Sequence, residues 1–207
     1  LVELIKLANL ILNITKSVAC ANRIEAVMEL PAGDTGAEQL PALRENAPAV
    51  EFKNVALRYA GASGDALSGV SFTAQPGQTI GVIGGTGSGK TSLVNLIPRF
   101  YDAAEGSVSV LGADVRDWPL AELRRRIGVV PQKALLFQGT ILENLLWGDP
   151  DAHLDAIGDA LEAAQALEIV EGKEGGLDSE VEQGGRNLSG GQRQRLTIAR
   201  ALVRKPQ

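Results

Sequence analysis

The first thirty residues show a helical pattern of apolar positions. Apolar side chains recur there at three- and four-residue intervals, at Leu4, Leu7, Ile11, Ile14, Val18, Ile24, Val27 and Met28. The pattern predicts one helix over residues 1–30, ended by Pro31. From Leu7 to Val18 this helix is only about 18 Å long, whereas a bilayer core needs about 30 Å. The residues alone allow an amphipathic helix packed on a soluble core, or the cytoplasmic end of a membrane span.

The pattern changes twice over the next forty-odd positions. Residues 31–48 carry three prolines, two glycines and mixed charges, which predicts an exposed linker. From Val50 the apolar residues alternate with polar residues or alanine, first to Tyr59 and again from Val70 to Ala74. This alternation predicts antiparallel strands. Tyr59 lies at the end of one of them, where simple edge packing would explain it.

Short apolar runs predict further strands, and longer periodic runs predict helices. Residues 79–83 read as a buried strand, 106–111 as another, and 127–130 as a buried parallel strand. Helices are expected over about 90–99, 117–126, from 149 onward and over about 192–204. Thr140 and Glu143 form a capping box at the start of one further short helix.

Composition narrows the function classes. The chain has 207 residues, of which 44% are hydrophobic and 22% charged, as in an ordinary globular protein. Its net charge of -5 argues against a nucleic-acid partner. With Cys20 as the only cysteine and His153 as the only histidine, an internal disulfide is excluded and a zinc site disfavoured. The start at Leu-Val-Glu, without a basic region or an initiator Met, suggests a fragment.

Residues 84–91, GGTGSGKT, carry the most specific chemistry. They fit the phosphate-loop pattern G-x-x-x-x-G-K-[ST], between a predicted strand and a predicted helix. Glycines let the backbone approach a phosphate, and successive N–H groups form an anion-binding concavity. Lys90 would reach the β- and γ-phosphates, and the Thr91 hydroxyl would ligate Mg²⁺. The sequence therefore predicts a nucleotide site here.

Polar residues near the end of the chain and at Gln132 are further candidates for ligand binding. Ser189 and Gln192 form a capping box at a helix start that includes two glycines, which predicts a second anion site. A solvated face is the favoured reading of the arginines along that helix, Arg193, Arg195, Arg200 and Arg204. Gln132, at the carboxyl end of a predicted strand, points to the ligand crevice of an open α/β sheet or is an ordinary loop amide.

Taken together, these motifs resemble the ATP-binding domain of an ABC transporter, nearest to the exporter type whose membrane helices share one chain with the ATPase. Residues 84–91 match Walker A and residues 188–192 match the LSGGQ signature. Gln132 matches the Q-loop, and Tyr59 falls where the family carries its adenine-stacking aromatic. RFYDAAEGSV, LFQGTILENL and GGRNLSGGQRQRLTIARAL look specifically like exporters, and the resemblance covers the whole chain.

The resemblance implies the fold class: α/β, a P-loop NTPase of ABC type. It comprises a parallel core sheet, an antiparallel β subdomain and a helical subdomain at about 133–190. Residues 1–30 become the cytoplasmic end of the last transmembrane helix and its extension, 31–48 a linker, and 49–207 an incomplete ATP-binding domain.

The resemblance also implies the cofactors ATP and Mg²⁺ and the residues that meet them. ATP would contact Tyr59, Gly84, Gly85, Thr86, Gly87, Ser88, Gly89, Lys90, Thr91 and Ser92. Mg²⁺ would be served by Thr91 and Gln132. ATP on a second ATP-binding domain, facing head to tail, would contact Leu188, Ser189, Gly190, Gly191 and Gln192.

The family's Walker B Asp, general-base Glu and switch His are not among these residues, so no catalytic residue is assigned. The implied function is ATP-driven export by a protein of the cell membrane, with this domain on the cytoplasmic side. Its partners would be its own transmembrane domain, a second ATP-binding domain and the transported substrate. A low-turnover regulatory half of a heterodimeric exporter and a stand-alone importer ATPase remain alternatives. Missing central strands would leave an open apolar sheet edge, so the isolated chain is expected to be unstable.

Overall fold

The computed structural model describes residues 2–29 and 36–207. The chain forms two compact units, Leu1–Asp34 and Thr35–Gln207. Each unit is described by itself.

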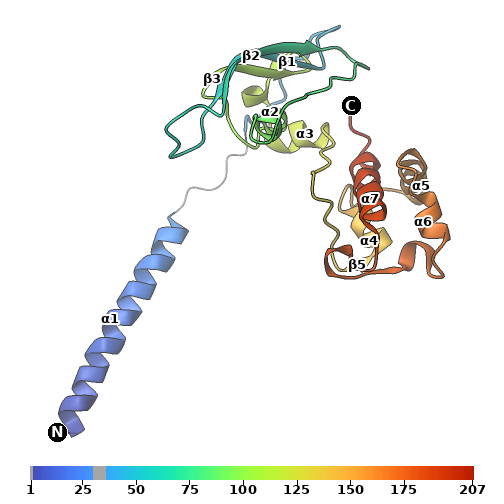
Figure 1. The fold of residues 1–207 in the computed structure, drawn as a ribbon. Coiled ribbons are helices and arrows are strands. Elements are labelled where there is room, and N and C mark those ends of the chain that lie inside the picture. The colour runs from blue at the N-terminus through green and yellow to red at the C-terminus, as the bar shows by residue number, and fades with distance from the viewer. Residues whose placement is uncertain (1, 30–35) are drawn as a thin grey trace. The chain divides into compact units, whose positions relative to one another are not determined.

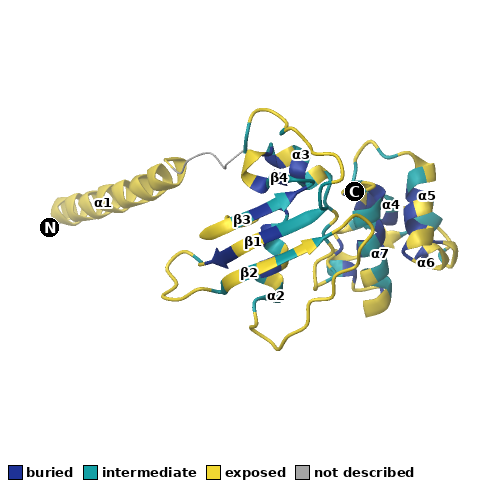
Figure 2. Ribbon diagram, turned by 90° about the horizontal axis from the view of Figure 1, so that it is seen from above, coloured by how far each residue is buried: buried dark blue, intermediate teal, exposed yellow. Residues whose placement is uncertain are grey.

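The first unit is a single helix, α1 (Val2–Met28), none of whose residues is buried (Figures 1 and 2). The predicted helix is therefore found over Val2–Met28, while positions 1 and 30 lie outside the described residues. Its 27 residues extend over about 40 Å. By length and composition the helix could cross a membrane, with a mean hydropathy of 1.4. The stretch of about 18 Å from Leu7 to Val18 is one part of this helix.

The second unit begins with an antiparallel sheet (Figure 1). Its strands β1 (Val50–Leu57), β2 (Leu67–Ala74), β3 (Glu105–Val110) and β4 (Ala113–Asp114) lie in the order β2-β1-β3-β4. Asn54 takes a positive φ of 48° inside β1 and shifts its pairing register. This irregularity explains why the alternation in the sequence restarts at Asn54.

Two short helices build the core under this sheet. They are α2 (Lys90–Leu96) and α3 (Leu120–Arg125). A 3-10 helix, η1 (Val115–Asp117), precedes α3. Leu93, Leu96 and Leu123 pack with Phe52 and the fully buried Trp118 in one apolar cluster. Helix α2 ends before Arg99, where the sequence placed its end, because Pro98 cannot continue it.

Residues from about 136 onward form a helical lobe with its own core (Figure 2). It contains α4 (Ile141–Leu146), α5 (Leu154–Ala163), α6 (Leu167–Glu171) and α7 (Gly190–Val203), with 3-10 turns η2 (Gly176–Asp178) and η3 (Gln183–Gly185). The small antiparallel pair β5 (Gly139–Thr140) and β6 (Glu180–Val181) closes it. The helix expected from residue 149 onward is divided between α5 and α6, because Gln165 has a positive φ of 54°.

Two predicted strands are not formed. Residues 79–83 and 127–130 lie outside every strand of the described chain, and no parallel pair occurs among residues 36–207. Ile83 is 98% exposed. A strand exists only through backbone hydrogen bonds to a neighbour, and neither segment has a paired neighbour in this part of the chain. The parallel pairing expected of these two segments is therefore not formed within the described residues.

Part of the predicted linker is docked rather than exposed. Gly36 forms an antiparallel bridge with Pro119, and the Ala37 N–H donates to the Trp118 carbonyl at 3.1 Å. Both Gly36 and Ala37 are half-buried. Residues 31–35 of the predicted linker lie outside the described residues.

Candidate functional site

The phosphate loop has the backbone that its glycines predict. Gly87 and Gly89 have positive φ values of 80° and 87°, and Gly89 is the residue immediately before α2. A Cβ on Gly89 would approach the Leu67 side chain to 2.7 Å and the Ala66 carbonyl to 3.0 Å. Only glycine combines this φ with this approach, so the loop geometry depends on its sequence.

Lys90 folds back over the loop from the first turn of α2. Its Nζ donates to the carbonyl oxygens of Gly84 at 2.8 Å and Gly85 at 2.6 Å, and to Ser88 Oγ at 3.4 Å. The ammonium group is thus held by neutral oxygens. A phosphate oxygen would form stronger, charge-assisted bonds with it.

A hollow of about 270 Å³ opens beside the loop, lined by Tyr59, Ala66 and residues 87–92. The Tyr59 hydroxyl and Ser92 Oγ lie 2.7 Å apart, in a hydrogen bond that either can donate. The structure therefore brings Tyr59 together with Lys90, Thr91 and Ser92. The hollow combines an aromatic ring, hydroxyl groups and a cation, which suits a phosphorylated aromatic ligand.

The second motif lies at the start of α7. Leu188 is buried, whereas Ser189, Gly190 and Gly191 are exposed. The capping box is formed: the Gln192 N–H donates to Ser189 Oγ at 3.2 Å, and the Ser189 N–H donates to Gln192 Oε1 at 2.9 Å. This motif and the phosphate loop lie in different lobes, and the hollow beside the phosphate loop is not lined by residues 188–192.

The arginines of α7 form the solvated face expected from the sequence only in part, because Arg204 is exposed whereas Arg193, Arg195 and Arg200 are half-buried. They donate to backbone carbonyls: Arg193 to Gly185 and Leu188, Arg195 to Gln165, Arg200 to Leu135, and Arg204 to Gly148 and Arg124. Burial lowers the pKa of the Arg200 guanidinium. Helical spacing alone could not reveal these bonds, because their acceptors are remote carbonyls.

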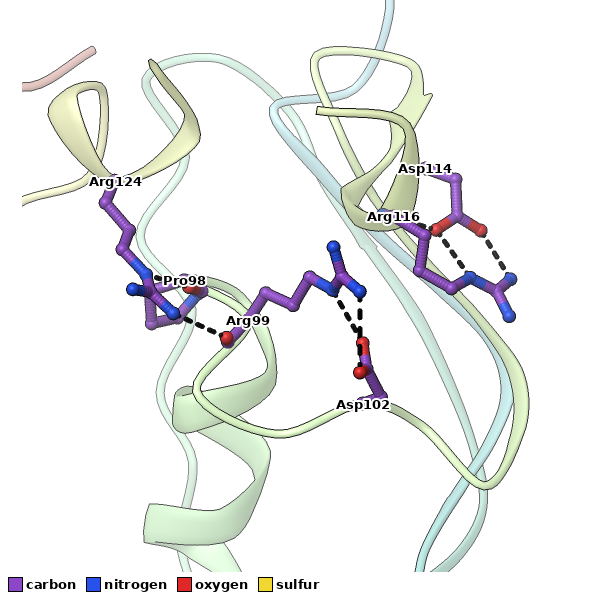
Figure 3. A network of polar contacts seen from close by, with 6 residues as sticks. All are labelled: Pro98, Arg99, Asp102, Asp114, Arg116 and Arg124. Carbon is purple, nitrogen blue, oxygen red and sulfur yellow. Dashed lines mark hydrogen bonds and ion pairs between the residues drawn. The ribbon is translucent and has the colours of Figure 1, made fainter. Parts of the chain in front are cut away.

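A further arginine secures the end of α2 (Figure 3). Arg124 of α3 donates to the carbonyls of Pro98 at 3.0 Å and Arg99 at 2.9 Å. Close by, Arg99 Nε donates to Asp102 Oδ1 at 2.6 Å. No local pattern predicted this network, which fixes the loop after the phosphate-loop helix.

Gln132 is exposed and lies apart from the phosphate loop. It lines a separate hollow of about 430 Å³ with Lys133 and residues of η3 and α7, among them Gly190 and Arg193. Thr91 does not line that hollow, so the structure does not bring together the two predicted Mg²⁺ ligands. Within residues 2–29 and 36–207, no cluster of three His, Cys, Asp or Glu residues could hold a metal by itself.

An apolar hollow of about 310 Å³ lies near the end of α4. Phe100, Phe137 and Trp147 line it, and the rings of Phe137 and Trp147 lie 4.8 Å apart. All three aromatic side chains are about half exposed or more. No pattern in the sequence singled out these aromatics, although Phe100 and Phe137 fall within two of the motifs that looked like exporters.

Comparison with known proteins gives a consistent family. The ABC transporter family profile matches residues 67–207. The ABC transporter ATP-binding protein YfiB of Bacillus subtilis is 45% identical over 95% of this chain and 34% of the relative. An ATP-dependent lipid A-core flippase of Chromobacterium violaceum is 40% identical over 91% and 32%. The β-(1→2)glucan export ATP-binding/permease protein NdvA of Rhodopseudomonas palustris is 44% identical over 82% and 29%.

Among solved structures, a bacterial Atm1-family ABC exporter with ATP bound matches with a TM-score of 0.82 and 32% identity. The match covers 93% of this chain and 34% of that one. The chain spans about a third of the length of the curated relatives it matches. The similarity supports the predicted ABC-type fold even though the parallel strands are not formed in the described residues.

Proposed function

Because this chain belongs to the ABC transporter family, we propose that it is the ATP-binding part of an exporter. The parent protein would couple ATP binding and hydrolysis to the transport of a substrate across a membrane. One observation carries the proposal: the phosphate loop, Lys90 and the ring of Tyr59 surround a single hollow. An anion-binding loop suits the phosphate chain of a nucleoside triphosphate, and an adjacent aromatic ring suits its base.

Within this hollow each residue has a separate task. Residues 84–89 offer backbone N–H groups to the phosphates, as glycine-rich loops do. Lys90 exchanges its bonds to the Gly84 and Gly85 carbonyls for bonds to phosphate oxygens, which are better acceptors. Tyr59 presents its ring to the adenine. Bound ATP supplies the phosphoanhydride whose cleavage drives the cycle.

We propose that Mg²⁺ enters this site with ATP. The Thr91 hydroxyl is available to it because Thr91 is exposed and lines the hollow. Gln132 would have to approach from the hollow next to α7, so its contribution requires movement of the segment that carries it. We therefore assign Thr91 as the primary protein ligand and Gln132 as a conditional one.

A second copy of the domain, or a related domain, would complete the site. Ser189, Gly190 and Gly191 are exposed at the start of α7, in the other lobe from this chain's own phosphate loop. Exposed hydroxyl and N–H groups at a helix start suit an anion supplied by another molecule. We propose that they meet the γ-phosphate of ATP bound to a partner that faces this domain head to tail.

The membrane assignment draws on α1 and on the relatives. Helix α1 is long and apolar enough to cross a bilayer, and the relatives bear the names of a flippase and an export permease. We propose that the protein is located in the cell membrane with this domain on the cytoplasmic side, where ATP is available. The apolar hollow at Phe137 and Trp147 would contact the protein's own transmembrane part.

Binding of MgATP to the full-length protein in nanodiscs, followed by isothermal titration calorimetry, tests the proposal. Lys90→Met should weaken binding at least about tenfold, because a charge-assisted contact to phosphate is lost. Lys53→Met is the matched control, since Lys53 is an exposed lysine of β1 paired with Glu51. Unchanged ATP affinity in Lys90→Met would overturn the assignment.

A substitution in the LSGGQ signature tests the proposed head-to-tail dimer separately. Ser189→Arg should leave ATP binding to the variant's own phosphate loop unchanged and abolish ATP-dependent association of two domains, measured by cross-linking. The added bulk and charge would stand where the partner's phosphate must enter. Association equal to that of the unmodified protein would contradict the head-to-tail arrangement.

A further inference from the structure

We infer that Tyr101 is a positioning residue for base recognition: it holds the ring of Tyr59 in the orientation that stacks on adenine. The inference rests on the proposed ATP site and adds a residue outside it. It follows from the contacts of the two tyrosines, from the hollow that only one of them lines, and from the loop that carries Tyr101.

Tyr59 needs external support because it lies beyond the end of β1, just before the turn at Gly61. Its hydroxyl is fixed by the 2.7 Å bond to Ser92 on α2. The ring is half-buried and also packs against the apolar cluster under the sheet. The hydroxyl bond lies on the long axis of the ring and does not restrict rotation about it, so the plane in which a base could stack is set by contacts on the ring itself.

Tyr101 supplies such a contact. The ring centroids of Tyr59 and Tyr101 are 5.0 Å apart and their planes meet at 88°, an edge-to-face arrangement that aromatic rings prefer. Tyr59 lines the hollow beside the phosphate loop, whereas Tyr101 does not. Tyr101 therefore acts on a ligand through Tyr59.

The loop that carries Tyr101 is held on both sides (Figure 3). Before it, Arg124 donates two bonds to the carbonyls of Pro98 and Arg99. Across it, Arg99 and Asp102 form an ion pair at 2.6 Å that spans the position of Tyr101. These contacts fix the backbone on both sides of Tyr101. The position of the ring is therefore defined by the backbone although Tyr101 is itself 44% exposed.

This arrangement predicts that loss of the Tyr101 ring weakens binding of the base and does not weaken binding of the phosphates. Removing the Tyr101 ring frees Tyr59 to rotate, so the stacked geometry must then be selected from several orientations. An edge-to-face aromatic contact corresponds to an affinity change of about 2-fold to about 12-fold. The phosphate loop has no contact with Tyr101 in the hollow and should retain its own affinity.

The experiment compares ATP with inorganic tripolyphosphate, each with Mg²⁺, on the full-length protein in nanodiscs. Tyr101→Leu should lower the affinity for ATP by about 2-fold to about 12-fold and leave the affinity for tripolyphosphate unchanged. Tyr101→Phe should keep the affinity for ATP. Phe72→Leu is the matched control, because Phe72 also belongs to an aromatic pair, with Phe52, and does not line the hollow beside the phosphate loop. A loss of tripolyphosphate affinity in Tyr101→Leu would overturn the inference in favour of a general structural role.

A double-substitution cycle provides an independent arm that uses ATP alone. In a Tyr59→Leu background, Tyr101→Leu should have no further effect, because Tyr101 acts only through Tyr59. Additive losses would contradict the inference. If the unmodified protein does not bind ATP, the proposed function fails; if it binds ATP and Tyr101→Leu binds equally well, only the role of Tyr101 fails.

Discussion

At Gly89 the chain passes from the phosphate loop into α2 with a φ of 87° and with Leu67 and Ala66 directly opposite. Gly89→Ala should therefore strain the backbone by about 1–3 kcal/mol and narrow the hollow. We expect a lower melting temperature and weaker ATP binding, measured by thermal unfolding and calorimetry. Gly158→Ala in α5 is the control, because nothing lies within 4 Å of the added Cβ and alanine favours a helix. Equal behaviour of the two variants would contradict the strained-loop interpretation.

Asp114 and Arg116 form an ion pair beside β4, at 2.7 Å (Figure 3). Burial alone would raise the pKa of Asp114, but hydrogen bonds from the Arg116 side chain and backbone, together with its charge, lower that pKa below its ordinary value of 3.8. A lowered folded-state pKa gives stability that is present above 3.8 and is lost as the pH falls through the folded-state value.

Asp114→Asn should accordingly destabilise the protein at neutral pH, and its difference from the unmodified protein should shrink below pH 3.8. Urea unfolding at several pH values, followed by tryptophan fluorescence, measures this, because Trp118 is fully buried close by in sequence. Arg116→Leu should raise the pKa of Asp114, because the side-chain hydrogen bonds and the positive charge are removed, so its destabilisation should also shrink as the pH falls. A difference that stays constant across this pH range would contradict the role of the pair.

Contacts of single residues were predictable where they are local. Both capping boxes, Thr140 with Glu143 and Ser189 with Gln192, form as the spacing predicted, because a helix start places the residues three apart within reach. The hydrogen bonds of the α7 arginines were not predicted, because their acceptors lie up to eighty positions away, as for Arg204 and Arg124. No local pattern encodes such a partner.

At the scale of elements, apolar runs predicted strands more readily than the structure forms them. Residues 79–83 and 127–130 have strand-like composition, yet neither is paired in the described chain. The strands that do form, β1 to β3, have hairpin or sheet neighbours within the same lobe. Composition can indicate that a segment suits a strand, but it cannot supply the neighbour that the strand requires.

Gly148, two residues after the end of α4, is buried against the backbone of α7. A Cβ there would meet the Arg200 carbonyl at less than contact distance and the Leu145 carbonyl at 3.1 Å. Gly148→Ala should destabilise the helical lobe by about 1–3 kcal/mol, because the obstructing atoms belong to the backbone. Hydrogen exchange of α4 and α7 measures this, with Gly158→Ala again as control. Unchanged protection of both helices would show that they can separate without cost.

At the scale of the whole molecule, the sequence identified both halves of the proposed ATP site but not their arrangement. Walker A and the signature were recognised from their residues, and the hollow with Tyr59 agrees with the expected grouping around Lys90. Gln132 was expected beside Thr91 and lies beside α7 instead. Its placement depends on how the two lobes meet, which no single motif determines.

The linker residues Gly36 and Ala37 dock against Trp118 and Pro119, which are far from them in sequence. Gly36 has a φ of 79°, and a Cβ would collide with the Trp118 carbonyl and lie 2.9 Å from the Leu120 nitrogen. Gly36→Ala should therefore undock the segment and speed hydrogen exchange of the Ala37 amide by about tenfold or more. Gly61→Ala, with a similar φ of 78° and open space around it, controls for backbone strain alone. Equal exchange in both variants would contradict docking through Gly36.

The bridge between Gly36 and Pro119 also has a mechanical consequence. A pull on the backbone from the N-terminal side of Gly36 reaches the sheet lobe at this bridge before it reaches β1, which is paired along both edges. The contacts at Gly36 should open at a lower force than β1, because β1 shares the load over hydrogen bonds along both of its edges. Their opening would release roughly 45 Å of chain between Gly36 and Val50. The segment would therefore be stiff under small loads and become an elastic tether under large ones.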